Sequence, residues 1–382
     1  MYSLSAYGLM VADRARVEAY AQALRKTVRP RSVVAEVGTG PGIFAVLACQ
    51  LGAGCVYAIE PSEIIQVARE VAAANGCAAK IEFLEDVSER ITLPRRADIV
   101  LSDLRGVLPL FQRHIPTIVD ARKRFLAPGG TLVPRSDSLR AAIVEAPKPY
   151  GEIVSPWEQN PLGLELNSAR NLAVNNIQKV RVGANQLLTE PREWATLDYY
   201  TIESPDVRSS LEWKTEQAGI GHGILTWFDA DLAEGVGFTN APGAPETIYG
   251  SLFFPWTRPV SLARGQAVCV SLEAKLIEND YVWRWTTQIE APSGSDASAI
   301  HFEQSQLGGA MLSAIQLHKR AADYVPHLSE DGRVRSRTLE LMDGILSLEE
   351  IARRLAKEFP QRFPEWRQAL SYAGAVSQEY SR

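Results

Sequence analysis

The sequence lacks the features that would tie it to a metal, an oxidising compartment or a membrane. Its four cysteines and five histidines are scattered, without a Cys-x-x-Cys pair, so no metal site is expected. Scattered cysteines also favour a reducing, cytoplasmic location. No stretch approaches the ~20 apolar residues of a membrane helix. The first ten residues lack the basic and apolar segments of a secretory signal.

An excess of positive charge is also absent. Forty Lys and Arg oppose 45 Asp and Glu, for a net charge of −5, so we expect neither nucleic acid nor a membrane as partner. The 46% of apolar residues is ordinary for a globular protein. At 382 residues, the chain is long enough for two or three domains.

The first third alternates strand and helix patterns. Apolar spacing predicts an amphipathic helix over residues 13–28. Strand-like runs follow at residues 32–38, 55–61, 80–86, 97–103 and 127–134, with helical stretches between them. This alternation predicts a doubly wound, Rossmann-like parallel sheet. We place an N-terminal helical segment at 1–30 and the Rossmann-like domain at 31–146.

The pattern changes near Pro147. Short alternating runs continue to about residue 289 and predict an antiparallel β-barrel domain over 147–305, with a less strand-like segment at about 158–185. Residues 292–298 are expected to form a loop. The region 306–382 is helical in pattern, and Ser347 with Glu350 forms a capping box.

A glycine-rich loop follows the first strand and opens a helix. Its E-x-G-x-G-x-G pattern consists of Glu36, Gly38, Gly40 and Gly42. Glycines suit a tight turn on which a ligand meets the backbone. Glu60, at the end of the next strand, is placed to accept hydrogen bonds from both ribose hydroxyls. In dinucleotide-binding folds a third glycine follows at a fixed spacing, and this loop has no glycine at that place. We therefore predict S-adenosyl-L-methionine (SAM) rather than NAD(P) as the ligand.

Other residues at strand ends are expected to line the same cofactor site. They are Pro61, Asp86, Val87 and Ser102. Asp86 and Val87 would lie beside the adenine. The alternative for Asp86 is a turn or helix cap without a ligand.

Several segments together resemble the protein arginine methyltransferases. AEVGTGPGIFAVLACQLGAGCVYAIEPS, FLEDVSERITLP, ADIVLSDLRG and RFLAPGGTLVP stand in the order and spacing of that family's core motifs. The resemblance covers about residues 1–290. It implies a SAM-binding Rossmann-like domain and a barrel with the active site between them, S-adenosylhomocysteine as product, and a homodimer formed through the 158–185 arm. It also implies that Arg16 holds the SAM carboxylate.

The sequence departs from this family where the methyl acceptor would bind. The family has two glutamates in S-E-x-x-G-x-x-x-x-x-E, whereas this chain has Asp103 and Gln112 at those places. The family's Thr-His-Trp triplet reads Thr247-Ile248-Tyr249. A guanidinium stays charged and needs paired carboxylates away from water, and Arg105 adds a like charge. We therefore predict methyl transfer to an O or N nucleophile of a small molecule or peptide, in natural-product or modified-peptide biosynthesis.

Three residues are the catalytic candidates. Asp103 is the candidate base or orienting acceptor. Arg105 either pairs with a substrate carboxylate in bidentate geometry or forms an internal ion pair with Asp103. His222, at the start of the strand HGILTWF, is either catalytic or a hydrogen-bonded structural residue.

Two other functions remain open. One is an arginine N-methyltransferase, of protein or free arginine, in which Asp103 replaces a glutamate. The other is a catalytically silent SAM-binding partner subunit. The C-terminal stretch resembles the winged-helix-like PqqD domains, which implies binding of a leader peptide; the alternative is a helical cap on the barrel.

Overall fold

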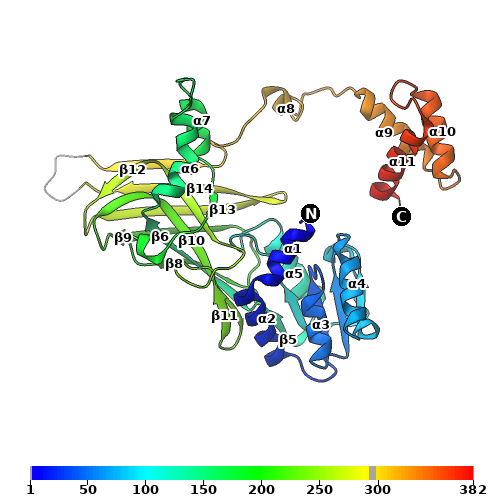
Figure 1. The fold of residues 1–382 in the computed structure, drawn as a ribbon, viewed down its shortest axis with the longest axis horizontal. Helices are drawn as coiled ribbons and strands as arrows, with labels where there is room; N and C mark the ends of the chain where they lie inside the picture. Colours follow the sequence, from blue (N-terminus) through cyan, green and yellow to red (C-terminus); the bar gives the residue numbers. More distant parts are fainter. Residues whose placement is uncertain (1, 292–297, 382) are drawn as a thin grey trace. The chain divides into compact units, whose positions relative to one another are not determined.

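The computed structural model describes residues 2–291 and 298–381, which form two compact units, Met1–Ala310 and Met311–Arg382 (Figure 1). The loop expected at 292–298 therefore lies almost entirely outside the described residues. Across the described ranges, no helix is both long and apolar enough to cross a membrane.

The first part of the first unit is a five-stranded parallel sheet. Its strands are β1 (Val33–Val37), β2 (Cys55–Ile59), β3 (Ile81–Leu84), β4 (Ala97–Ser102) and β5 (Leu126–Val133). Their order is β3-β2-β1-β4-β5, with every pair parallel. The helices of this part are α3 (Ile43–Gln50), α4 (Ile64–Ala74) and α5 (His114–Arg124). The chain order reverses between β1 and β4, where ligands bind in open α/β sheets. The predicted Rossmann-like domain is confirmed.

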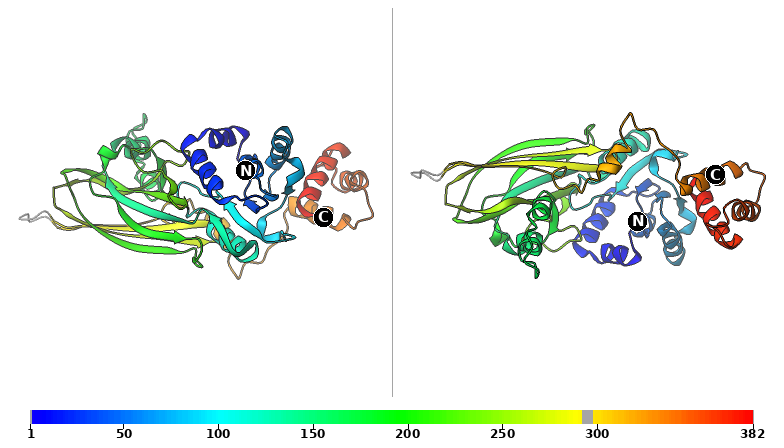
Figure 2. Two further views of the ribbon diagram at one scale, coloured as in Figure 1. Left: turned by 90° about the horizontal axis from the view of Figure 1, so that it is seen from below. Right: turned by 90° about the horizontal axis from the view of Figure 1, so that it is seen from above.

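Two helices precede this sheet. They are α1 (Leu4–Ala12), which the sequence analysis did not predict, and α2 (Arg14–Thr27), which matches the helix expected over 13–28. The Asp13 carboxylate caps α2 by accepting from the Arg16 amide, at 3.1 Å. Tyr20 and Leu24 on α2 are completely buried. Figure 2 shows α2 where the parallel sheet meets the strands that follow it.

The second part of this unit is built from two antiparallel sheets. One has the order β7-β12-β10-β6-β8, with β11 paired to β10, and the other has the order β15-β14-β13-β9. The strands are β6 (Ser136–Val144), β7 (Gln178–Val180), β8 (Arg192–Asp198), β9 (Val207–Lys214), β10 (Gly219–Ala233), β11 (Val236–Thr239), β12 (Ser251–Leu262), β13 (Ala267–Ile277), β14 (Asp280–Ile289) and β15 (Ile300–Ser305). Phe254 of β12 packs edge-on against Trp283 and Trp285 of β14, with ring centroids 5.1 and 5.3 Å apart. Aromatic side chains therefore fill the core between the sheets.

The boundary expected at residue 147 is too late. β6 pairs with β10 and β8 along its length, so the antiparallel part begins at Ser136. Only Pro134 and Arg135 separate β5 from β6. The change of pattern at Pro147 instead marks α6 (Pro147–Glu158). A short connection between two buried strands leaves no compositional break for the sequence to show.

The segment at 158–185 is partly helical and exposes apolar side chains. It contains α7 (Asn167–Ala173), and Leu162 and Leu164 are 78% and 56% exposed. Trp157 at the end of α6 is also exposed. Leu162 and Leu164 lie in the segment that, by the resemblance to the arginine methyltransferases, is expected to be a dimerisation arm, and Trp157 directly precedes it.

The second unit is helical. α8 (Ala314–His318) is short and exposed, whereas α9 (Glu330–Leu341), α10 (Leu348–Glu358) and α11 (Trp366–Tyr380) pack around Val334, Ile351 and Leu355. The Ser347–Glu350 capping box is present at the start of α10. Within residues 311–381 the structure has no strand, and a winged helix needs a pair of them. The likeness to PqqD domains stays a prediction.

The capping box allows a test of how the second unit is stabilised. Ser347→Ala removes the acceptor for the Glu350 amide and is expected to lower the free energy of unfolding of this unit by about 1 kcal/mol. Urea denaturation followed by the fluorescence of Trp366 measures it. The control Ser336→Ala, on the exposed face of α9, is expected to change stability by less than about 0.5 kcal/mol. Equal losses in the two variants would contradict the assignment.

Candidate active site

A cavity of about 740 Å³ opens at the carboxyl ends of β1 and β4. The glycine-rich loop and Glu60 form one end, and Asp103 with Tyr249 forms the other. Tyr2, Tyr7 and Met10, in and beside α1, also line it. One continuous space thus joins the predicted cofactor loop to the predicted acceptor residues.

The glycine-rich loop forms a wall of this cavity. Gly38 and Gly40 have φ values of 78° and 51°, which side chains rarely adopt. A Cβ atom on Gly38 would lie 2.5 Å from the Leu104 side chain, and one on Gly40 would lie 3.2 Å from the Tyr7 ring. Glycine therefore keeps the backbone open to a ligand. Gly42 has a different role, because its Cβ would lie 2.9 Å from that of Ala68, so it lets α3 and α4 pack closely.

The two glutamates predicted for the cofactor are both in the cavity wall. Glu60 accepts from the Gly40 amide at 3.0 Å and from the Ser62 amide and hydroxyl at 3.1 and 2.5 Å. Glu36 is 3% exposed and accepts from the Thr39 hydroxyl at 2.7 Å. Burial raises the pKa of Glu36 to about 8. Pro61 and Val87 also line the cavity.

Asp86 and Ser102 are placed differently. Neither belongs to the cavity lining as the described residues form it. Asp86 accepts from the Val87 amide and pairs with Arg90, which matches the turn-cap alternative. Ser102 is buried at the end of β4, and its carbonyl oxygen accepts from the Tyr20 hydroxyl at 3.1 Å. Ser88 and Glu89, which the sequence analysis did not name, line the cavity instead.

Asp103 lies at the end of the cavity where the methyl acceptor is expected to bind, called the acceptor end below. Hydrogen-bond donors surround its carboxylate. It pairs with the Nε of Arg16 and, at 3.0 Å, with the Nη1 of Arg105. The Tyr249 hydroxyl lies 2.8 Å from both carboxylate oxygens. Burial opposes ionisation, but the two guanidinium groups hold the pKa of Asp103 below its usual value. The carboxylate therefore stays charged.

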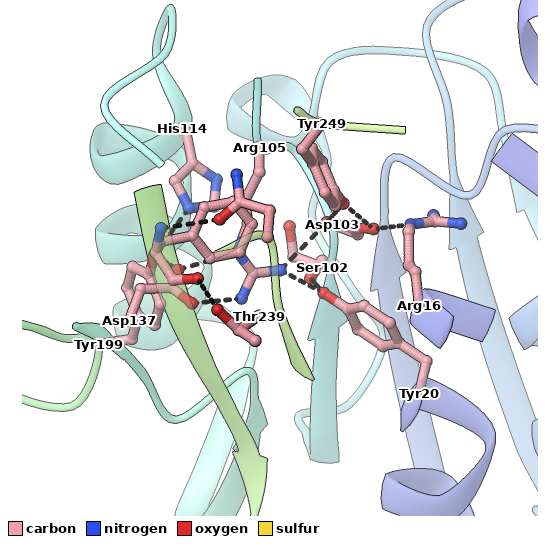
Figure 3. A network of polar contacts seen from close by, with 12 residues as sticks. Arg16, Tyr20, Ser102, Asp103, Arg105, His114, Asp137, Tyr199, Thr239 and Tyr249 are labelled. Atoms are coloured by element: carbon pink, nitrogen blue, oxygen red, sulfur yellow. Dashed lines mark hydrogen bonds and ion pairs between the residues drawn. The ribbon is translucent and has the colours of Figure 1, made fainter. Parts of the chain in front are cut away.

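Arg105 is held inside the protein. Its Nε and Nη2 each donate to Asp137 at 2.8 Å, and its Nη1 donates to the Tyr20 hydroxyl at 2.5 Å (Figure 3). The side chains of Arg105 and Asp137 are completely buried. The rings of Phe228 and Phe238 lie 5.5 and 5.8 Å from the guanidinium carbon. Of the two alternatives for Arg105, the structure has the internal ion pair with Asp103, at 3.0 Å, and Asp137 occupies the bidentate face that a substrate carboxylate would need.

Gln112 and Ile248 stand where the arginine methyltransferases have their second glutamate and the histidine of the Thr-His-Trp triplet. Gln112 and Ile248 both line the cavity. The Ile248 amide donates to Asp13 at 2.7 Å, which ties this loop to the cap of α2. Gln112 presents a neutral amide where the family has its second glutamate, so Asp103 is the acid that remains at this motif.

His222 lies away from these residues. Its Nδ1 is 2.8 Å from the Ile220 carbonyl oxygen, and its ring packs edge-on against Tyr150. Within the described part of the chain, His222 does not line the cavity. The structure places it as a hydrogen-bonded strand residue and does not bring it to Asp103.

Four residues of this polar network escaped the sequence analysis. They are Tyr20, His114, Asp137 and Tyr199. Tyr199 donates to Asp137, and the Nε2 of His114 lies 3.0 Å from the Tyr199 hydroxyl. Asp137 gives no signal in the sequence, because it lies in an unremarkable strand 32 residues beyond Arg105. Among the residues placed by the structure, no cluster of His, Cys, Asp and Glu is arranged to hold a metal ion.

Two sequence families match this chain. Residues 19–146 match ribosomal protein L11 methyltransferase (PrmA), and residues 136–287 match the arginine methyltransferase oligomerization subdomain. The second match begins where β6 begins. Neither match extends into the C-terminal unit.

Curated proteins are also similar to this chain over much of its length. The probable protein arginine N-methyltransferase 6 of Arabidopsis thaliana is 28% identical over 251 residues, covering 63% of this chain and 57% of that protein. Protein arginine N-methyltransferase 1 of Dictyostelium discoideum is 26% identical over 282 residues, covering 71% and 82%. The match therefore spans less than two thirds of the Arabidopsis protein.

Solved structures share the fold. A chain of the Trypanosoma brucei PRMT1 enzyme-prozyme heterotetrameric complex with AdoHcy gives a TM-score of 0.71 at 18% identity, covering 78% of this chain and 97% of its own. Arabidopsis thaliana protein arginine methyltransferase 10 gives 0.69 at 21% identity, covering 80% and 98%. The chain is similar to SAM-dependent methyltransferases of the protein arginine methyltransferase type. As predicted, its first unit has a Rossmann-like part and a barrel part, and SAM is the cofactor that these similarities indicate.

The raised pKa of Glu36 predicts how the stability of this protein depends on pH. The unfolded carboxyl loses its proton near 4.5, whereas the folded one keeps it up to about pH 8. Between these values the folded state binds more protons, so stability falls as pH rises. Glu36→Gln removes this dependence and is expected to gain stability relative to the unmodified protein from pH 4.5 to 8. Urea denaturation at several pH values measures the difference.

Glu70→Gln, on the exposed face of α4, is the control for this experiment. It is expected to differ from the unmodified protein by the same small amount at every pH. A Glu36→Gln difference that also stays constant with pH would contradict the raised pKa.

The buried Arg105–Asp137 pair predicts a large loss of stability. Asp137→Asn leaves a buried guanidinium without its partner and is expected to cost about 3–5 kcal/mol. Arg105→Met combined with Asp137→Leu removes both charges and is expected to recover most of that loss. Glu303→Gln breaks the exposed pair with Arg284 and is expected to cost less than about 1 kcal/mol. Equal losses from Asp137→Asn and Glu303→Gln would contradict this account.

Proposed function

We propose that this chain is an active methyltransferase that transfers the methyl group of SAM to a nitrogen nucleophile on a polypeptide. The observation that supports this is the single cavity from Gly38, Gly40 and Glu60 to Asp103. The open glycine wall, with the side chains of Glu60 and the protonated Glu36, fits the nucleoside part of SAM. Arg16, on the same cavity, is the cation for its carboxylate.

Methyl transfer from SAM requires no covalent bond between the substrate and the protein. SAM supplies a methyl group on a sulfonium, and transfer is an in-line displacement. The C–S bond breaks as the N–C bond forms, the electron pair stays on sulfur, and the nitrogen then releases a proton. The chain's own task is to exclude water, through Tyr2 and Tyr7 near α1, and to orient the nucleophile, through Asp103.

Arginine is the acceptor that the relatives favour. Both relatives described above are named as arginine N-methyltransferases, and neither name supports the natural-product or modified-peptide interpretation. Asp103 keeps a carboxylate at the acceptor end. When Arg16 turns to the carboxylate of SAM, the Asp103 oxygen that it now pairs with keeps only the Tyr249 hydroxyl and can accept a guanidinium N–H.

A neutral amine or hydroxyl, on a small molecule or peptide, is the second candidate. The observation that favours it is the pair of cations around Asp103, at Arg16 and Arg105, with Gln112 where a second acid would be. One carboxylate shared with Arg105 binds a guanidinium more weakly than two free ones. A neutral nucleophile does not need the second carboxylate.

We propose a homodimer as the assembly. The residues that support it are the exposed apolar ones of the arm, Trp157, Leu162 and Leu164, within a region that matches an oligomerization subdomain. The Trypanosoma brucei complex pairs an enzyme with a prozyme, so a silent subunit that activates a partner is the further alternative. The silent-subunit alternative predicts that the isolated chain binds SAM but does not transfer its methyl group.

Two variants at the acceptor end distinguish the acceptor classes. With arginine peptides, Asp103→Asn is expected to lower kcat/KM at least 100-fold, because a guanidinium loses the charged Asp103 carboxylate as its partner. Gln112→Glu restores a second acid and is expected to raise it. Methylation by mass spectrometry, on peptides with arginine, lysine or a free N-terminal amine, measures both.

Binding of S-adenosylhomocysteine, measured by calorimetry, is the control for an intact cofactor site. If the unmodified protein methylates the amine peptides and leaves the arginine peptides unchanged, arginine is excluded. If it binds the cofactor product and methylates nothing, the proposed activity fails in favour of the silent subunit.

A further inference from the structure

One buried nitrogen at the acceptor end has no partner. His114 is the first residue of α5, it is among the residues that line the cavity, and it is 2% exposed. Its Nδ1 finds no hydrogen-bond partner among residues 2–291 and 298–381. An unpaired buried polar atom costs about 1–3 kcal/mol, so a ligand that pairs with it gains an interaction that the free protein lacks.

The neighbouring hydrogen bonds decide which ring nitrogen carries the proton. Asp137 accepts hydrogen bonds from Arg105 at both of its oxygens. The Tyr199 hydroxyl has one proton, which it donates to Asp137. Its oxygen can then only accept from the Nε2 of His114, at 3.0 Å. The imidazole is thus the Nε2–H tautomer, and Nδ1 carries a lone pair.

The ring is also held neutral. Burial, together with the nearby Arg105 guanidinium, lowers the pKa of His114 to about 3. A neutral imidazole adds a hydrogen-bond acceptor to the site without adding charge. Gln112, two residues earlier, stands where the related enzymes have their second acid.

We propose that His114 accepts a hydrogen bond from the substrate. Its Nδ1 receives one N–H of the nitrogen that becomes methylated, and Asp103 receives another N–H of the same nitrogen. This rests on the proposed function and narrows its substrate class to nitrogen groups with at least two N–H bonds. The chain of Arg105, Asp137, Tyr199 and His114 positions the lone pair. Arg105 and Asp137 are positioning residues, since neither is free to contact the substrate.

Two substitutions separate this role from a structural one. His114→Gln places a donor near Nε2, which keeps the bond to Tyr199 and removes the acceptor at Nδ1. His114→Asn places an amide oxygen near Nδ1 and loses the bond to Tyr199. We expect His114→Gln to lower kcat/KM for the amine or arginine peptide about 10- to 100-fold, and His114→Asn to retain more activity. Binding of S-adenosylhomocysteine is expected to be unchanged in both.

A purely structural histidine predicts the reverse order, because the Gln variant preserves the contact with Tyr199. Activity of His114→Gln equal to that of the unmodified enzyme, or higher than that of His114→Asn, would therefore overturn the proposal. Loss of folding is checked by thermal denaturation of the same samples.

A second measurement needs no acceptor. Nitrogen NMR of protein labelled in its five histidines, with His114→Gln to assign the signal, is expected to show His114 as a neutral Nε2–H ring from pH 5 to pH 8. A protonated Nδ1 would overturn the inference. If the unmodified enzyme methylates none of the peptides, the proposed function fails, and this measurement still decides the tautomer on which His114 depends.

Discussion

The bidentate pair between Arg105 and Asp137 is the interaction on which the active site depends. It joins the loop after β4 of the parallel sheet to β6, the first strand of the antiparallel part. Two completely buried charges are tolerable only with full pairing and hydrogen bonding, and Tyr20, Tyr199 and Asp103 complete that requirement. The pair therefore fixes how the two parts of the first unit meet at the cavity. The position of Asp103 follows from it, because Arg105 holds one of its oxygens.

The network also sets the charge of the acceptor end. Two guanidinium groups, from Arg16 and Arg105, face two carboxylates, from Asp103 and Asp137, so the charges balance. The three tyrosines, Tyr20, Tyr199 and Tyr249, all have raised pKa values through burial and remain neutral. The site thus differs in kind from one with two unpaired acids. Its polarity lies in directed hydrogen bonds more than in net charge, which is why the identity of the acceptor is open to amines as well as guanidinium.

The regular elements of the fold were readable from the sequence wherever a local pattern specifies them. The parallel strands are continuous apolar runs, the helix at 13–28 has a clear apolar stripe, and the box at Ser347 depends on residues three apart. The start of the antiparallel part was missed because β5 and β6 are joined almost directly. α1 was also missed: none of its residues is buried, so it has no apolar stripe facing a core. A regular spacing of apolar residues predicts a helix only when one face of that helix is buried. A helix without a buried face has no such spacing.

The sequence by itself determined the cofactor half of the site. Gly38, Gly40 and Glu60 act through backbone conformation and short chain separations, which are written locally. The acceptor half was decided by the tertiary structure. Arg105 and Asp137 are 32 residues apart, His114 and Tyr199 are 85 apart, and Asp103 and Tyr249 are 146 apart. A hydrogen bond needs donor and acceptor within about 3 Å and correctly directed. The packing of β4, β6 and α5 against the loops after β8 and before β12 brings these groups to that distance. The fold therefore shows that Arg105 is already paired and that the Nδ1 of His114 lacks a hydrogen-bond partner among the described residues.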